Sequence, residues 1–123
     1  MKIDKLKNRI PENITVVAVS KRKSNKEILD VYNTNHKDFG ENRVQELIIK
    51  NNDLPKDIRW HMIGKLQRNK VKFIAPFIHL IHSVDSYKLL LEIEKQAKKN
   101  QRVINILLQI KISNDESKSG LSF

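Results

Sequence analysis

Short apolar runs alternate with helix-forming stretches along this chain, and the alternation limits the possible folds more than any other feature. The apolar runs recur at intervals of roughly 20 to 25 residues, the length of a compact strand–helix unit with short loops. This pattern predicts an α/β fold with a parallel sheet and right-handed crossovers. The strands are expected at residues 14–20, 37–40, 58–63, 77–82 and 103–112.

The stretches between these strands carry helix signals. Ser24 and Glu27 have the spacing of a capping box at the start of one helix. Asp85 or Ser86 is expected to cap a long helix, and residues 69–75 predict a short one. Apolar side chains at helical spacing predict the packed faces: Ile28, Val31 and Tyr32; Val44, Leu47 and Ile48; and Leu89, Leu90, Ile93 and Ala97.

Length and composition narrow the class of protein. A chain of 123 residues with 39% hydrophobic residues is large enough for one domain with a core. The absence of cysteine excludes disulfides, thiolate metal sites and cysteine nucleophiles. The first ten residues are too charged for a signal peptide, and no apolar run is long enough to span a membrane. We therefore expect a cytoplasmic protein without a membrane partner.

The formal net charge of +10 raises nucleic acid as a partner, because neutralising phosphates drives such binding. The basic residues are scattered, however, and aromatic residues that could stack on bases make up only 6% of the chain. Lysine-rich solvated faces explain the charge better, so no nucleic-acid partner is expected.

Lys21 ends the first apolar run, at the carboxyl end of the expected strand, where α/β sheets carry ligand sites. Val17, Val19 and Lys21 share one face of this strand; both faces are apolar, which predicts cover on both sides. Two interpretations follow. A strand-end lysine commonly extends into solvent, and the strand alone favours this interpretation. In an apolar mouth, its pKa would fall from roughly 10.4, and the neutral amine could form a Schiff base.

Other features gather at the same sheet edge. Gly40, Gly64 and Gly120 each follow an expected strand, which favours a ligand surface that the backbone approaches closely. The polar stretches 39–46 and 60–70 follow the second and third strands at this edge. Together with Lys21, they indicate a binding site.

Two pairs of residues within these elements have a spacing that could indicate an ion pair or a metal site. Glu46 has the spacing of a helical ion pair with Lys50. His79 and His82 form an HxxH pattern, but residues three apart on a strand point to opposite faces, so no metal site is expected.

Five stretches of the sequence resemble the pyridoxal phosphate homeostasis protein family, in order from the first strand to the last residues. They are Ala18-Val-Ser-Lys21, Phe39-Gly-Glu-Asn-Arg-Val-Gln-Glu46, Trp60-His-Met-Ile-Gly-Lys-Leu-Gln-Arg-Asn-Lys70, His82-Ser-Val-Asp85 and Lys118-Ser-Gly120. The resemblance implies an alanine racemase-like (β/α)8 barrel of the TIM type. It also implies that pyridoxal 5'-phosphate (PLP) is held as a Schiff base on Lys21, with Asn42, His61 and Ser83 lining the cofactor mouth.

By the same resemblance, the protein would buffer intracellular PLP and deliver it to PLP-dependent apo-enzymes, without catalytic turnover of its own. Two departures accompany the match. Lys111 stands where the family pattern has asparagine. A closed barrel needs roughly 200 residues or more, so five strands make a partial barrel. Residues 1–123 are thus expected to be a single domain, truncated to the N-terminal half, without the later strands that carry the family's phosphate cup.

Three alternatives to PLP homeostasis stay open from the sequence. The first is a PLP-dependent amino-acid racemase or decarboxylase-like enzyme, which would need a second base and a partner domain. The second is a basic nucleic-acid-binding module. The third is a non-functional remnant without cofactor affinity. The sequence predicts no particular oligomeric state.

Overall fold

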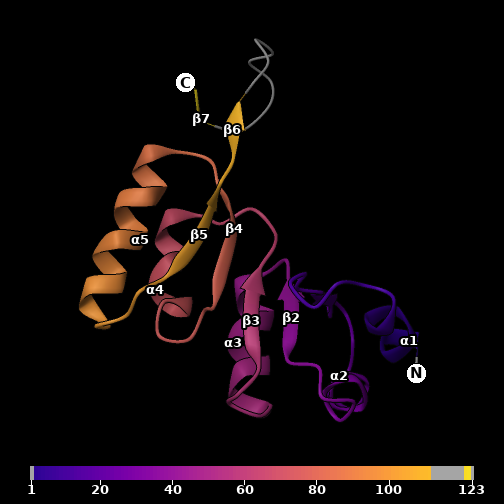
Figure 1. Cartoon of the computed structure of the whole chain (residues 1–123). Coiled ribbons are helices and arrows are strands. Elements are labelled where there is room, and N and C mark those ends of the chain that lie inside the picture. The colour runs from indigo at the N-terminus through magenta and orange to yellow at the C-terminus, as the bar shows by residue number, and fades with distance from the viewer. Residues whose placement is uncertain (1, 112–120, 123) are drawn as a thin grey trace.

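The computed structural model describes residues 2–111 and 121–122, and over these residues strands and helices alternate as predicted (Figure 1). The main strands are β1 (Ala18–Val19), β2 (Asp38–Glu41), β3 (Arg59–Met62), β4 (Leu80–Val84) and β5 (Asn105–Leu108). The helices are α1 (Lys2–Asn8), α2 (Asn25–Tyr32), α3 (Val44–Asp53), the 3₁₀ turn η1 (Arg68–Lys70), α4 (Val71–Ile74) and α5 (Tyr87–Lys99). Two short strands, β6 (Ile110–Lys111) and β7 (Leu121–Ser122), pair with each other.

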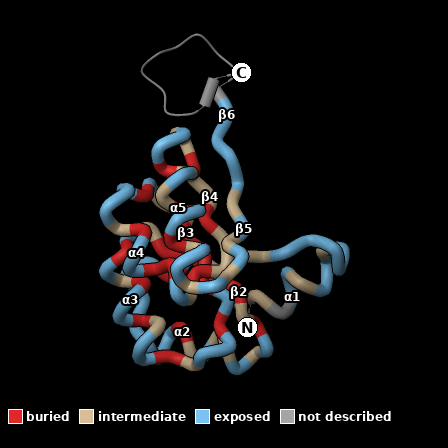
Figure 2. Tube along the Cα trace, turned by 90° about the vertical axis from the view of Figure 1, so that its left-hand side faces the viewer, coloured by how far each residue is buried: buried red, intermediate tan, exposed pale blue. Residues whose placement is uncertain are grey.

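The five main strands form one sheet in the order β1-β2-β3-β4-β5, and every neighbouring pair is parallel. Strands that follow one another in the chain are thus also neighbours in space. Figure 2 shows α3, α4 and α5 on one side of the strands, with α1 away from them. This is the connectivity of a partial (β/α) barrel, which confirms the predicted fold class.

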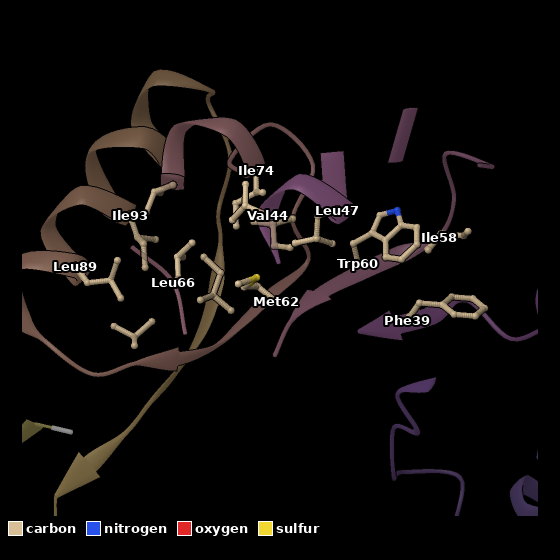
Figure 3. Packing of buried hydrophobic residues seen from close by; sticks show 14 of the residues in the cluster. Phe39, Val44, Leu47, Ile58, Trp60, Met62, Leu66, Ile74, Leu89 and Ile93 are labelled. Atoms are coloured by element: carbon tan, nitrogen blue, oxygen red, sulfur yellow. The ribbon is translucent and has the colours of Figure 1, made fainter. Parts of the chain in front are cut away.

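The hydrophobic core lies between the sheet and the helices (Figures 2 and 3). Phe39 on β2 and Trp60 on β3 are buried there with their ring centroids 5.9 Å apart, and Leu47 and Ile93 reach the core from α3 and α5. Because side chains alternate along a strand, Asp38 and the other neighbours of Phe39 and Trp60 face away from the helices. The sheet thus has one packed apolar face and one face with polar groups.

Two serines begin helices as expected. The Ser24 hydroxyl accepts from the Glu27 N–H at 3.1 Å, and the Glu27 carboxylate accepts from the Ser24 N–H at 3.1 Å, which confirms the capping box. Ser86, rather than Asp85, caps α5 by accepting from the Leu89 N–H at 3.1 Å. Of the predicted packed faces, Ile48 is wrong because its side chain is exposed, and Ala97 is only half-buried and lies outside the core.

The first strand differs from its prediction. β1 comprises only two residues instead of seven, and Val19 is 51% exposed. The expectation that both faces of this strand are covered is therefore wrong. β1 is the edge strand of an open sheet, and α3, α4 and α5 cover the other face of that sheet (Figure 2).

Other boundaries also shift. The predicted fifth strand is divided into β5 and β6, and the side chain of Lys111 in β6 lies outside the described residues. Gly40 lies within β2 instead of after it, Gly64 does follow β3, and Gly120 falls outside the described residues. None of the described helices combines the length and apolar character needed to cross a membrane.

Candidate functional site

Lys21 lies in the turn that follows β1, at the carboxyl edge of the sheet. The turn is closed by the Lys23 N–H, which donates to the Ser20 carbonyl at 3.0 Å. Arg22 takes a left-handed conformation with φ of 61°, and its N–H donates to Glu46 Oε2 at 3.4 Å. Among the described residues, the exposed Lys21 amine has no ion-pair or hydrogen-bond partner, so it is available to a ligand.

A buried polar network supports this turn from the helix side. Lys50 Nζ, on α3, donates to the Ser20 carbonyl at 2.7 Å, to Glu41 Oε2 at 2.7 Å and to Glu46 Oε2 at 3.2 Å. The Ser20 hydroxyl also donates to Glu41. Burial raises the pKa of Glu41, and hydrogen bonds from Lys50 and Ser20 partly offset this effect. The network ties the carboxyl ends of β1 and β2 to α3 and so fixes the backbone beside Lys21.

An open cleft of about 480 Å³ surrounds Lys21. Four of its side chains are cationic and one, Glu46, is a carboxylate, so the cleft suits an anionic ligand. The hypothesis of an apolar mouth around Lys21 is therefore wrong, because Val19 is the only apolar side chain in the lining. The lining residues are Val19, Lys21, Arg22, Lys23, Asn42, Arg43 and Glu46.

Asn42 enters the same cleft from the loop after β2, and its contact with a cofactor stays a prediction. Gly64 holds this loop close to the end of β3. A Cβ at position 64 would lie 2.6 Å from the Asn42 carbonyl oxygen and 3.0 Å from its Cα, which no side chain tolerates without a shift of backbone. Position 64 therefore requires glycine, because a side chain there would displace the Asn42 backbone.

His61 and Ser83, the other two predicted cofactor residues, are not among the residues that line the cleft. His61 is buried on β3, where its Nε2 lies 3.0 Å from Asp38 Oδ1 and its Nδ1 lies 3.0 Å from His82 Nε2. Ser83 is half-buried on β4. Their contact with a cofactor stays a prediction.

The pKa values of the titratable groups around His61 are shifted from their ordinary values. Burial alone would raise the pKa of Asp38, but hydrogen bonds from Arg59 and His61 lower it to about 2, so this carboxyl is ionised at neutral pH. Burial lowers the pKa of His79 and His82, which favours their uncharged forms.

The two histidines of the HxxH pattern do not point to opposite faces as expected. The His79 and His82 rings both contact the ring of His61, with centroid separations of 5.4 and 5.2 Å. Strand alternation fails here because His79 precedes the first residue of β4 and therefore lies outside the regular pleat.

A second, larger cleft lies on the helix side, with a volume of about 1050 Å³. It runs between the η1–α4 segment and α5, and its lining includes five lysine or arginine side chains and one carboxylate, Glu92. These cations are Arg68, Lys72, Lys88, Lys95 and Lys99. Five of the 24 lysine and arginine residues thus line one cleft.

Comparison with known proteins agrees with this architecture. No protein-family model matches the chain. The pyridoxal phosphate homeostasis protein of Helicobacter pylori strain J99 is 44% identical over 110 residues, which are 88% of this chain and 50% of the relative. That of Escherichia coli K12 is 35% identical over 117 residues, which are 92% of this chain and 50% of the relative. The chain belongs to the pyridoxal phosphate homeostasis protein family.

Solved structures extend the comparison with this family to the fold. PipY of Synechococcus elongatus PCC7942, described without PLP and with PLP bound, matches with a TM-score of 0.86 and 36% identity. The match covers 98% of this chain and 57% of PipY in the PLP-free structure. The chain thus spans about half the length of the pyridoxal phosphate homeostasis proteins it matches.

Sequence reasoning missed two parts of this family member's candidate site. Arg22 and Arg43 were not singled out as cleft residues, although both adjoin or lie within quoted motifs. The contact of Asp38 with His61 was also missed, because these residues are 23 positions apart and no spacing rule connects them.

Proposed function

We propose that residues 1–123 form one PLP-binding domain in which Lys21 holds the cofactor covalently, and that its role is PLP homeostasis. The observation that carries this proposal is the available Lys21 amine in a cationic cleft at the carboxyl edge of the sheet. Support also comes from the relatives, which are named pyridoxal phosphate homeostasis proteins, and from PipY, whose structure was determined with PLP bound.

The residues of the cleft fit both ends of the cofactor. PLP supplies an aldehyde that condenses with a lysine amine, with loss of water, to a Schiff base. Arg22, Lys23 and Arg43 provide positive charge for a phosphate ester, and arginine can bind phosphate through two parallel hydrogen bonds. The Asn42 side chain can orient the ligand by hydrogen bonding.

The proposal describes a carrier rather than an enzyme. Support comes from the names of the relatives, which refer to homeostasis and not to a reaction. Delivery of PLP to apo-enzymes and a cytoplasmic location belong to the same proposal. Turnover of amino acids by the purified chain would instead favour a racemase or decarboxylase-like enzyme.

The proposal is tested by adding PLP to the purified chain, reducing with borohydride and locating the label by mass spectrometry. We expect one equivalent of label on Lys21, and its loss in Lys21→Ala. Lys26→Ala is the matched control, because Lys26 is an exposed lysine that pairs with Asp30 outside the cleft and should leave the labelling of Lys21 intact. Equal labelling of the parent and Lys21→Ala would refute the assignment. No binding of PLP in equilibrium dialysis would identify a non-functional remnant.

A second candidate function, binding of nucleic acid, is favoured by the basic cleft beside α5. RNA binding there should weaken steeply with salt and should fall in Lys95→Glu. Retention of RNA affinity in that variant, or no binding at low salt, would exclude the α5 cleft as a nucleic-acid site.

A further inference from the structure

The cluster of Asp38, His61 and His79 lies on the sheet face away from the helices and is separate from the Lys21 cleft. One possible ligand atom from each of the three side chains lies within 4.8 Å of the other two. Asp38 Oδ1 and His61 Nε2 are only 3.0 Å apart, while Asp38 and His61 are 6% and 2% exposed. The two buried side chains and the imidazole of His79 thus converge on one point.

Asp38 and His61 are each held by a further partner. Arg59 donates to Asp38 Oδ1 through Nε at 2.9 Å and to Oδ2 through a terminal nitrogen at 2.7 Å. His82 Nε2 lies 3.0 Å from His61 Nδ1. In the metal-free state His61 Nε2–H donates to the ionised Asp38; on metal binding this nitrogen would lose its proton, and His61 Nδ1–H would donate to His82. Outer groups that fix a carboxylate and an imidazole tautomer in this way are typical of metal centres.

We propose that Asp38, His61 and His79 bind a divalent first-row transition metal ion, and that Zn²⁺ is the ion that fits best. Two imidazole nitrogens and one carboxylate oxygen form a donor set that zinc uses, with further positions open to water. The ion would replace the hydrogen bond between His61 Nε2 and Asp38 Oδ1.

The geometry is close to that required for coordination. Tetrahedral ligands at zinc distances are about 3.3 Å apart, a separation that Asp38 and His61 approach already. The His79 ligand atom must come closer by a side-chain rotation, which is feasible because His79 precedes β4 and is less enclosed than the other two. The positive charge of Arg59 opposes a dication, but its side chain is 47% exposed and therefore screened by solvent.

The site is tested by measuring the zinc affinity of the whole chain in competition with a chromophoric zinc indicator. The chain carries no polyhistidine tag in this experiment. We expect one equivalent of Zn²⁺ bound by the parent and at least a tenfold loss of affinity in His79→Ala. Asp57→Asn is the control, because this carboxylate is exposed and pairs with Lys37 outside the cluster. His82→Asn should weaken binding about 10- to 100-fold through the tautomer of His61. Circular dichroism checks that each variant folds.

Nuclear magnetic resonance of the imidazole nitrogens keeps the test valid if a variant fails to fold. In the parent, zinc should shift the signals of His61 and His79 more than those of His36, which contacts the Asp38 carbonyl but lies outside the ligand set. Equal zinc affinity of the parent and a folded His79→Ala would overturn the proposal, as would absence of binding or unshifted His61 and His79 signals. Lys21→Ala should bind zinc like the parent, so zinc binding can be tested separately from attachment of PLP to Lys21.

Discussion

Three acceptors converge on one buried cation, Lys50, which links the turn of Lys21 to α3. The side chains of Lys50 and Glu41 are 9% and 0% exposed, so their charges are largely removed from water. Such a pair gives little net stability compared with apolar side chains, but removing one partner leaves the other charge buried and unpaired. The fold is therefore sensitive to each member of this network.

Lys50→Met should lower the free energy of unfolding by about 3 kcal/mol, because Glu41 then loses its cationic partner. Denaturation by urea at neutral pH measures this loss. Lys26→Met is the matched control: Lys26 pairs with Asp30 at the surface, where an ion pair contributes less than about 1 kcal/mol. Adding Glu41→Gln to Lys50→Met should recover part of the stability. A loss no greater than that of Lys26→Met would contradict the importance of the buried pair.

At the scale of elements, α2 begins with a complete capping box, and this cap includes a titratable group. The pKa of Glu27 lies below its ordinary value of 4.5, mainly because the Ser24 backbone N–H donates a hydrogen bond to its carboxylate. A carboxyl whose pKa is lower in the folded state stabilises that state above its unfolded pKa. This contribution is lost as the pH falls through the folded pKa.

Glu27→Gln should therefore reduce stability at pH 7, and its difference from the parent should shrink as the pH falls below 4.5. Urea denaturation of both proteins across this range is the measurement. Glu12→Gln, an exposed residue outside the described helices, should leave the pH profile of the parent unchanged. A constant gap between parent and Glu27→Gln at all pH values would show that the Glu27 charge does not act through the cap.

At the scale of the whole molecule, the open sheet has two edge strands, β1 and β5. On and near β5, large apolar side chains are exposed: Val103, Leu107, Leu108 and Ile110. Unpaired strand edges with apolar side chains promote pairing with other chains. The chain spans about half the length of the relatives it matches.

We therefore expect the 123-residue chain to associate with rising concentration, and Leu107→Lys to reduce this association. Sedimentation velocity over a range of concentrations measures both. Leu6→Lys is the control, because Leu6 is similarly exposed but lies on α1, far from β5 in the chain. A parent chain that remains monomeric at all concentrations, or an equal effect of both substitutions, would count against the β5 edge.

The sequence by itself determined the order of strands and helices, the capping box at Ser24, the position of Lys21 at the carboxyl edge and the family. Each of these depends on periodicity or on a motif of neighbouring residues, which are local properties. Asn42 could be assigned to the Lys21 cleft for the same reason, since its motif follows directly after β2.

Only the tertiary structure decided how the remaining side chains are placed. It made Val19 half-exposed, made the Lys21 cleft cationic instead of apolar, and buried Lys50 against Glu41. It also brought both HxxH histidines to His61. The physical reason is that these features depend on which strands become neighbours and on which sheet face is covered, and neither property has a spacing that the sequence alone displays.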